Sequence, residues 1–152
     1  MPRKLVTLLA ATAVAGGISF ATAAEPSAED AKDYRVAVMT TLRGHIGAAS
    51  MIVRGLVEDR GFLVAHAEGL EKGASELAHV FQEGSDVGES EALPAIWENP
   101  DEFAAAVEEA QKATRNFREV VAGGGDKGEI AAAFREVGGS CKGCHDSFRV
   151  DD

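Results

Sequence analysis

The segment Cys141-Lys142-Gly143-Cys144-His145, close to the end of the chain, constrains the fold more than any other feature. Two residues separate the cysteines and a histidine follows the second, which is the attachment pattern of a c-type haem. On a helix, positions 141 and 144 lie on one face, one turn apart, so each thiol can add to one vinyl group of the same haem. The imidazole of His145 is then placed to bind the iron as the proximal ligand. The sequence therefore predicts one haem c per chain, covalently held by two thioethers.

Three other uses of the cysteine pair are half of a zinc site, a thiol–disulfide redox pair and a structural disulfide. Zinc requires further ligands, and the chain has no second cysteine pair and no two histidines three to five residues apart. A thioredoxin-like redox pair requires a βαβ setting that the sequence lacks. A disulfide is the form that the pair would take in an oxidising compartment without haem.

Residues 1–24 have the pattern of a cleaved secretory signal peptide. Arg3 and Lys4 precede a short apolar run rich in small residues, and cleavage is expected after Ala23 or Ala24. The alternative, an uncleaved anchor, requires a longer and more hydrophobic run. Covalent haem attachment in bacteria takes place beyond the cytoplasmic membrane. We therefore expect residues 25–152 to form a single domain in the periplasm.

The chain is acidic, with a formal net charge of −10. Removal of residues 1–24 takes away Arg3 and Lys4 and no acidic residue, which lowers the charge to −12. Nucleic-acid binding requires a basic patch, so we expect no nucleic-acid partner. Stable association with an anionic membrane is disfavoured for the same reason. The acidic surface is expected to keep the protein soluble, and it would also suit a basic electron-transfer partner.

Strand patterns are nearly absent, and apolar residues recur every three or four positions in four segments. These segments predict helices over residues 28–58, 62–81, 101–122 and 127–150. Between the second and third lies an irregular stretch, 82–100, that is rich in glycine, proline and acidic residues. The sequence therefore predicts an all-α fold, an antiparallel four-helix bundle in up-down-up-down order that encloses the haem.

Local signals add detail to this bundle. Ser27 to Asp30 resembles a capping box that starts the first helix, and Gly123 to Gly125 is expected to end the third. Trp97, with Ile96, is expected to pin the irregular stretch onto the core. Glycines at 44, 47, 55, 61, 69 and 73 weaken the first two helices. These glycines would permit close helix approach or leave room for a flat cofactor. Alternatively, some of them mark frayed helix ends or kinks, chiefly Gly55 and Gly61.

Three sequence segments together resemble the class II cytochromes c, the family that includes cytochrome c′. Residues Phe134 to Arg149 are similar to the C-terminal haem helix of that family. Tyr34-Arg35, followed by Met39, matches a pattern early in its first helix. Pro94-Ala-Ile-Trp97, followed by Phe103, matches a third segment in the same order. The resemblance covers nearly the whole of residues 25–152.

The resemblance implies roles for particular residues. It implies a haem attached to Cys141 and Cys144 with His145 as proximal ligand, Arg35 near a haem propionate, and Met39 over the distal face. Val36 stands where the family often has glutamine, so any polar contact from that position is lost. Polar loop residues that some members place near the haem edge correspond only loosely to Ser85 and Asp86. Members are often dimers through the first two helices. Gly44, Gly47 and Ala48 would permit such a homodimer, or close packing within one chain.

The residues after the haem motif contain no methionine or histidine, so any distal ligand from the protein comes from upstream. Met39 is the candidate, and its alternative role is that of a buried core residue that touches the haem without binding iron. Met51 is expected in the core. His45, His66 and His79 are expected on or near surface turns rather than at the iron.

Two arginines also have ordinary alternatives. Arg35 lies one helical turn before Met39, which suits a propionate contact. It would otherwise form an exposed ion pair with Glu29, Asp30 or Asp33. Arg149, four residues after His145, is interpreted as a helix-end charge that is favourable to the helix dipole.

We expect a periplasmic cytochrome that transfers one electron at a time to and from redox partner proteins. The alternative is a five-coordinate haem protein that binds gases such as NO or CO, in which Met39 only shields the distal face. The sequence shows no grouping of nucleophile and base and no glycine-rich phosphate loop, so we do not expect an enzyme.

Overall fold

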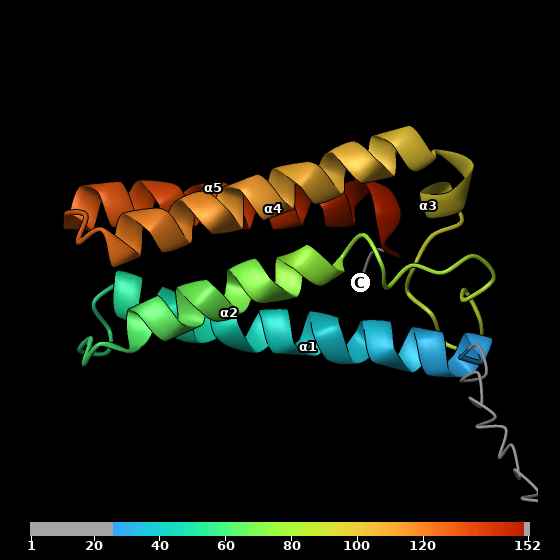
Figure 1. Ribbon diagram of the computed structural model, residues 1–152, viewed down its shortest axis with the longest axis horizontal. Helices are drawn as coiled ribbons and strands as arrows, with labels where there is room; N and C mark the ends of the chain where they lie inside the picture. The colour runs from blue at the N-terminus through green and yellow to red at the C-terminus, as the bar shows by residue number, and fades with distance from the viewer. Residues whose placement is uncertain (1–25, 151–152) are drawn as a thin grey trace, which may run out of the picture.

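The computed structural model describes residues 26–150, and it is an antiparallel four-helix bundle (Figure 1). The predicted signal peptide, 1–24, lies outside the described residues. The helices are α1 (Ala28–Val53), α2 (Phe62–Glu76), α3 (Ala95–Glu98), α4 (Pro100–Ala122) and α5 (Lys127–Phe148). Four of them form the bundle, and α3 is a single turn in the connection between α2 and α4. The prediction of an all-α bundle is confirmed.

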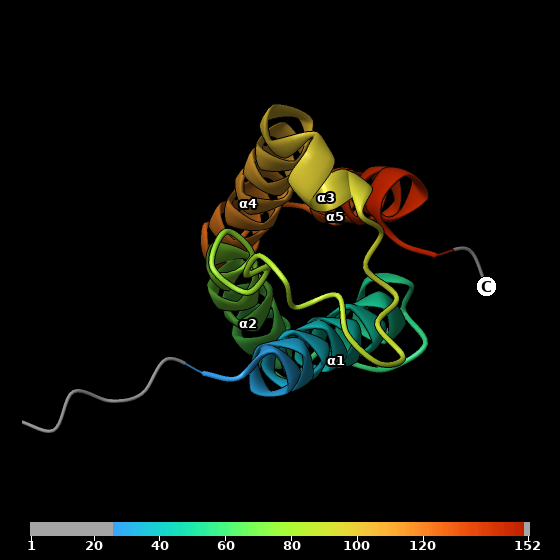
Figure 2. The same ribbon diagram turned by 90° about the vertical axis from the view of Figure 1, so that its right-hand side faces the viewer.

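The four long helices do not pack equally on one another. α5 packs chiefly on α4, α2 packs on both α1 and α4, and α1 contacts α5 much less. In Figure 2 the connection between α2 and α4 runs across one end of the bundle, from α1 towards α5. The start of α1 and the end of α5, which carries the haem motif, lie at this same end (Figure 1).

Three helices end earlier than the sequence predicted. α1 ends at Val53 rather than at residue 58, and α2 ends at Glu76 rather than at residue 81. Gly55 has a φ of 72°, and the N–H of Leu56 donates to the carbonyl of Met51, a Schellman-type ending. Leu56, which lies beyond this ending, is exposed. The fourth helix ends at Phe148, two residues earlier than predicted.

The predicted start of the first helix is confirmed. The hydroxyl of Ser27 accepts a hydrogen bond from the N–H of Asp30. A second cap, which the sequence analysis missed, starts α5. The carboxylate of Asp126 accepts from the N–H of Glu129, and the Glu129 carboxylate accepts from the N–H of Asp126. This reciprocal pair fixes the first turn of the helix that carries the haem motif at its other end.

The core consists of two clusters of buried residues, and they differ in whether α5 contributes to them. The first cluster includes Ala133 and Val137 of α5, and its buried members are Ala49, Leu63, Ala67, Leu70, Ala113, Phe117, Ala133 and Val137. The second cluster lies nearer the haem motif, and its buried members are Ala74, Leu77, Val107 and Ala110. Those four residues come from α2, the turn after it and α4. Within residues 26–150, α5 therefore contributes buried core residues to the first cluster and none to the second.

Among the described helices, α1 alone is long and apolar enough by length and composition to cross a membrane. Core helices of soluble bundles meet the same criterion. The apolar residues of α1 have partners within the bundle, since Leu42, Ile46, Ile52 and Val53 pack against the first cluster. One face of α1 thus packs within the bundle, although only 11% of its most apolar window is buried.

Gly69→Ala is expected to lower the free energy of unfolding because α1 and α2 approach closely there. A Cβ atom at position 69 would lie 2.4 Å from Cε1 of His45. We expect a loss of about 1–2 kcal/mol in urea unfolding, because overpacking outweighs the gain in helix propensity.

Gly47→Ala is the matched control, because a Cβ atom there meets no atom within 4 Å. It is expected to raise the free energy of unfolding by about 0.5–1 kcal/mol. Equal changes in the two variants would contradict the close approach at Gly69.

Candidate haem site

The haem motif occupies the last two turns of α5, and the end of that helix is fixed to the connection between α2 and α4. The N–H of Leu93 donates to the carbonyl of Phe148 at 3.0 Å, and the N–H of Val150 donates to that of Glu91 at 2.9 Å. The side chain of Arg149 also donates to the Glu91 carboxylate, at 2.7 Å. These bonds hold the motif at a fixed place at the end of the bundle. The ion pair makes Arg149 more than the simple helix-end charge that we expected.

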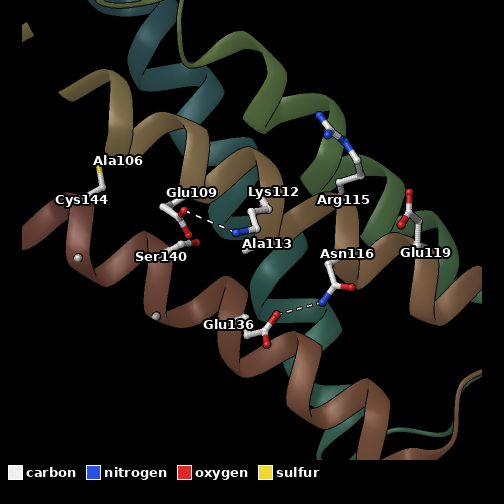
Figure 3. Close-up of a pocket in the computed structure, with 12 residues that line it drawn as sticks. Ala106, Glu109, Lys112, Ala113, Arg115, Asn116, Glu119, Glu136, Ser140 and Cys144 are labelled. Atoms are coloured by element: carbon white, nitrogen blue, oxygen red, sulfur yellow. Dashed lines mark hydrogen bonds and ion pairs between the residues drawn. The ribbon is translucent and has the colours of Figure 1, made fainter. Parts of the chain in front are cut away.

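Both cysteines are free thiols and half-buried. Burial raises the pKa of Cys141 and of Cys144 above the ordinary value, so both stay protonated at neutral pH. Cys141 packs against the first core cluster. Cys144, one helical turn later, faces α4 instead (Figure 3).

Cys144 lines an open groove between α4 and α5 (Figure 3). Several polar side chains line this groove, among alanines and glycines. Lys112 forms an ion pair with Glu109 at 3.8 Å, and the amide of Asn116 donates to Glu136 at 3.0 Å. His145, Arg35 and Met39 do not line it. The groove is therefore an outer surface beside the haem motif rather than the pocket on the distal side.

His145 is exposed at the end of α5. Partial loss of water around its ring lowers the pKa of His145 below the ordinary value, and the charge of Arg149 acts in the same direction. The nearby carboxylates of Asp146 and Glu91 oppose this shift without cancelling it. The imidazole is therefore neutral at pH 7, the form that binds a metal ion.

Met39 is half-buried on α1 and packs against the second core cluster, as do Leu42 and Phe103. That cluster is the one to which α5 contributes no buried residue. Met39 thus lies on an apolar surface, in the half of α1 that begins at the haem end of the bundle. Its contacts are those of a core residue.

Arg35 is buried, with only 4% of its surface exposed. Its guanidinium donates to the hydroxyl of Ser85 at 2.7 Å, to the carbonyl of Ser85 at 2.8 Å, and to the hydroxyl of Ser90 at 3.1 Å. A longer bond of 3.4 Å reaches the carbonyl of Val80. Burial lowers the pKa of Arg35, and the carboxylate of Asp86 partly offsets that effect. The alternative of an exposed ion pair with Glu29, Asp30 or Asp33 is wrong.

A chain of ring contacts continues from Arg35 to the end of α5. The Arg35 guanidinium lies 5.3 Å from the centre of the Phe81 ring. Phe81 and Phe103 form an edge-to-face pair at 4.8 Å, and Phe103 and Phe148 form another at 5.2 Å. Trp97, as predicted, pins the connection, because its indole N–H donates to the carbonyl of Phe81 at 3.2 Å. The sequence analysis missed this chain because its members are far apart in sequence.

Other candidate residues lie away from the positions that we expected. Met51 is exposed rather than part of the core, with 43% of its surface accessible. His45 on α1 and His66 on α2 are half-buried and contact each other, so the expectation of surface turns is wrong for both. The expectation of a surface turn is confirmed for His79, which is exposed in the turn after α2. Ser85 is buried and bonded to Arg35, and Asp86 beside it is exposed.

The residues present fit a covalently bound haem. Two unpaired thiols stand one turn apart on a helix, and a neutral imidazole follows the second. Thiols supply the two S–H groups that thioether formation requires, and imidazole is the usual proximal ligand of haem iron. The limited contact between α1 and α5 also leaves room for a flat group between them.

The comparisons with known proteins agree with this chemistry. The model of the family described as "Cytochrome C'" matches residues 30–149. The chain belongs to the cytochrome c′ family. Cytochrome c′ of Rubrivivax gelatinosus is 33% identical over 129 residues, which cover 79% of this chain and 94% of that protein. A match to cytochrome c-554 of Cereibacter sphaeroides, 41% identical over 76 residues, covers 48% of this chain and 56% of that protein.

Solved structures of the family have the same fold. The crystal structure of the Rubrivivax gelatinosus protein has a TM-score of 0.74 and 30% identity, and it covers 80% of this chain and 96% of that one. Two variants of cytochrome c′ from Alcaligenes xylosoxidans, also 30% identical, have TM-scores of 0.74 and 0.75. One is a nitric oxide complex and the other has bound carbon monoxide; each match covers 82% of this chain and nearly all of that one.

Membership of the family establishes the cofactor as a covalent c-type haem, and the two cysteines of this chain are present to attach it. The roles of His145, Arg35 and Met39 remain predictions. So does the homodimer through the first two helices. Gly44 and Gly47 do leave open space on α1, since a Cβ atom on either would meet nothing within 4 Å.

Arg35→Ala is expected to destabilise the protein by about 3 kcal/mol, because the buried acceptors of the connection lose a charged donor. Urea unfolding of the purified protein measures this loss. Arg43→Ala is the control, since Arg43 is an exposed arginine of the same helix, and a change below about 0.5 kcal/mol is expected for it. Similar losses in the two variants would show that the network around Arg35 contributes little.

Proposed function

We propose that this protein is a periplasmic electron carrier that exchanges one electron at a time through its haem. The observation that carries the proposal is the position of Cys144, which lines an open groove between α4 and α5 (Figure 3). A group attached to that sulfur has one edge close to the surface. Electron transfer between proteins requires such an edge and does not require a substrate pocket. The proposal extends to His145 as proximal ligand and to Met39 as the sixth ligand.

When bound, the haem supplies the ferric/ferrous couple; the chain holds it and sets its surroundings. The two cysteines and the neutral His145 fix its position on α5. Met39 and the apolar second cluster keep water from the opposite side. The buried charge of Arg35 lies at the same end of the bundle and is held in place by the connection. A thioether sulfur as second axial ligand would raise the reduction potential.

Gas binding is the second candidate function, and two observations favour it. Structural relatives with 30% identity have been solved with bound nitric oxide and carbon monoxide. Met39 also has apolar packing partners of its own, so it can remain in place without an iron–sulfur bond. In that arrangement Met39 would only shield the distal face of a five-coordinate haem, and a small gas would bind beside it.

The spin state of the ferric protein tests the ligand role of Met39. We expect a low-spin spectrum in the wild type and a conversion to high spin in Met39→Leu, which keeps the side-chain volume but has no sulfur. Optical and electron paramagnetic resonance spectra measure both. Met51→Leu is the control, because the exposed Met51 should leave the spectrum unchanged. A high-spin wild type that binds carbon monoxide when reduced would overturn ligation and favour gas binding.

The groove gives a separate test of electron transfer. Gly139 lines the groove, and a Cβ atom there meets nothing within 4 Å, so a large side chain can be accommodated. We expect Gly139→Trp to slow reduction by hexaammineruthenium(II) by up to about tenfold, because the indole covers the approach to Cys144. Stopped-flow absorbance measures the rate.

Gly139→Ala is the matched control, since it changes the same position without covering the groove. Its rate and the reduction potentials of both variants are expected to equal those of the wild type. Equal rates for the tryptophan and alanine variants would show that electrons do not enter through this groove.

A further inference from the structure

Two imidazoles meet between α1 and α2, in a place that the proposed electron transfer does not use. Nδ1 of His45 and Nδ1 of His66 are 3.2 Å apart, and the two ring centres are 5.5 Å apart. Both side chains are half-buried, so the pair is held by the protein but remains accessible to water.

The pair is held in place by close packing. The ring of His45 lies so near to the backbone of Gly69 that a Cβ atom there would come within 2.7 Å of three of its ring atoms. Gly69 is one turn after His66 on α2, so the glycine provides the space that His45 fills. One ring is wedged between helices and the other faces it. The Nδ1 atoms of His45 and His66 are therefore held close to each other with little freedom to move apart.

We propose that His45 and His66 bind a divalent transition-metal ion, represented by Zn²⁺, through their two Nδ1 atoms. Zinc–imidazole bonds are about 2.0–2.1 Å long, and two nitrogens 3.2 Å apart then subtend about 100–106° at the metal. This angle is close to that of a tetrahedral site. Imidazole is also a preferred ligand of zinc, copper and nickel. Water completes the coordination, because the pair is only half-buried.

The proton balance of binding is simple. Without metal, one ring carries a proton on Nδ1 and donates it to the Nδ1 lone pair of the other. Metal binding requires both Nδ1 lone pairs, so the donor ring changes to the tautomer protonated on Nε2. No net proton is released from the neutral pair. The net charge of −10 on the chain favours the approach of a cation.

Isothermal titration calorimetry of the holoprotein with Zn²⁺ tests the proposal. In the holoprotein the cysteines are bound to haem and cannot compete, and Zn²⁺ does not change the oxidation state of the iron. We expect one ion per chain in the wild type and at least about tenfold weaker binding in His66→Gln. His79→Gln is the control, because His79 is exposed and should bind no differently from other surface groups. Equal binding in both variants, or no binding by the wild type, would overturn the proposal.

A second measurement uses only the wild-type protein, so it does not require that any variant folds. The zinc K-edge absorption of the wild-type protein with one equivalent of Zn²⁺ is expected to show the scattering of two imidazoles near 2.0 Å. A spectrum with oxygen ligands alone would contradict the site. Neither outcome depends on the spin state of the haem, so the site and the proposed electron transfer can fail separately.

Discussion

The buried guanidinium of Arg35 is the interaction on which the haem end of the bundle depends. α5 contributes no buried residue to the second core cluster, and its apolar contact with this end is the ring of Phe148 against Phe103. The connection between α2 and α4 adds polar bonds to this contact, and Arg35 binds that connection through Ser85 and Ser90. A buried charge without such partners would cost several kcal/mol, whereas one with four acceptors can be retained. The bonds from Glu91 and Leu93 to the end of α5 complete the link from α1 to the haem motif.

The two ends of the bundle are therefore stabilised by different forces. The far end has Phe117 and Val137 fully buried in a cluster that draws on all four long helices. The haem end has fewer large core residues and more polar and ring–ring contacts, from Arg35 through Phe81 and Phe103 to Phe148. Segments held by few apolar contacts open more readily than a packed core. This places the more adaptable part of the fold where a large flat group has to be accommodated.

Sequence reasoning was strongest where a local pattern determines the outcome. The motif from Cys141 to His145 and the periodicity of four helices led to the correct cofactor and fold. The reasoning failed where distant segments meet. Nothing local connects Arg35 with Ser85, or His45 with His66, because those contacts depend on how α1 lies against other elements. Helix ends were misjudged at Gly55, where one left-handed residue ends a run that is still apolar. Met51 was assigned to the core from its place further along the first helix, yet 43% of its surface is exposed.

The remaining question about function depends on a competition at one side chain. Met39 already has apolar neighbours on α2 and α4, so its sulfur does not need iron to be placed favourably. Ligation would have to outweigh any of these contacts that the side chain loses in reaching the haem. α1 and α5 touch little, and the connection that Arg35 holds joins them at this end through its bonds to the end of α5. The network around Arg35 would therefore bear on the proposed ligation by Met39 through the spacing of these two helices.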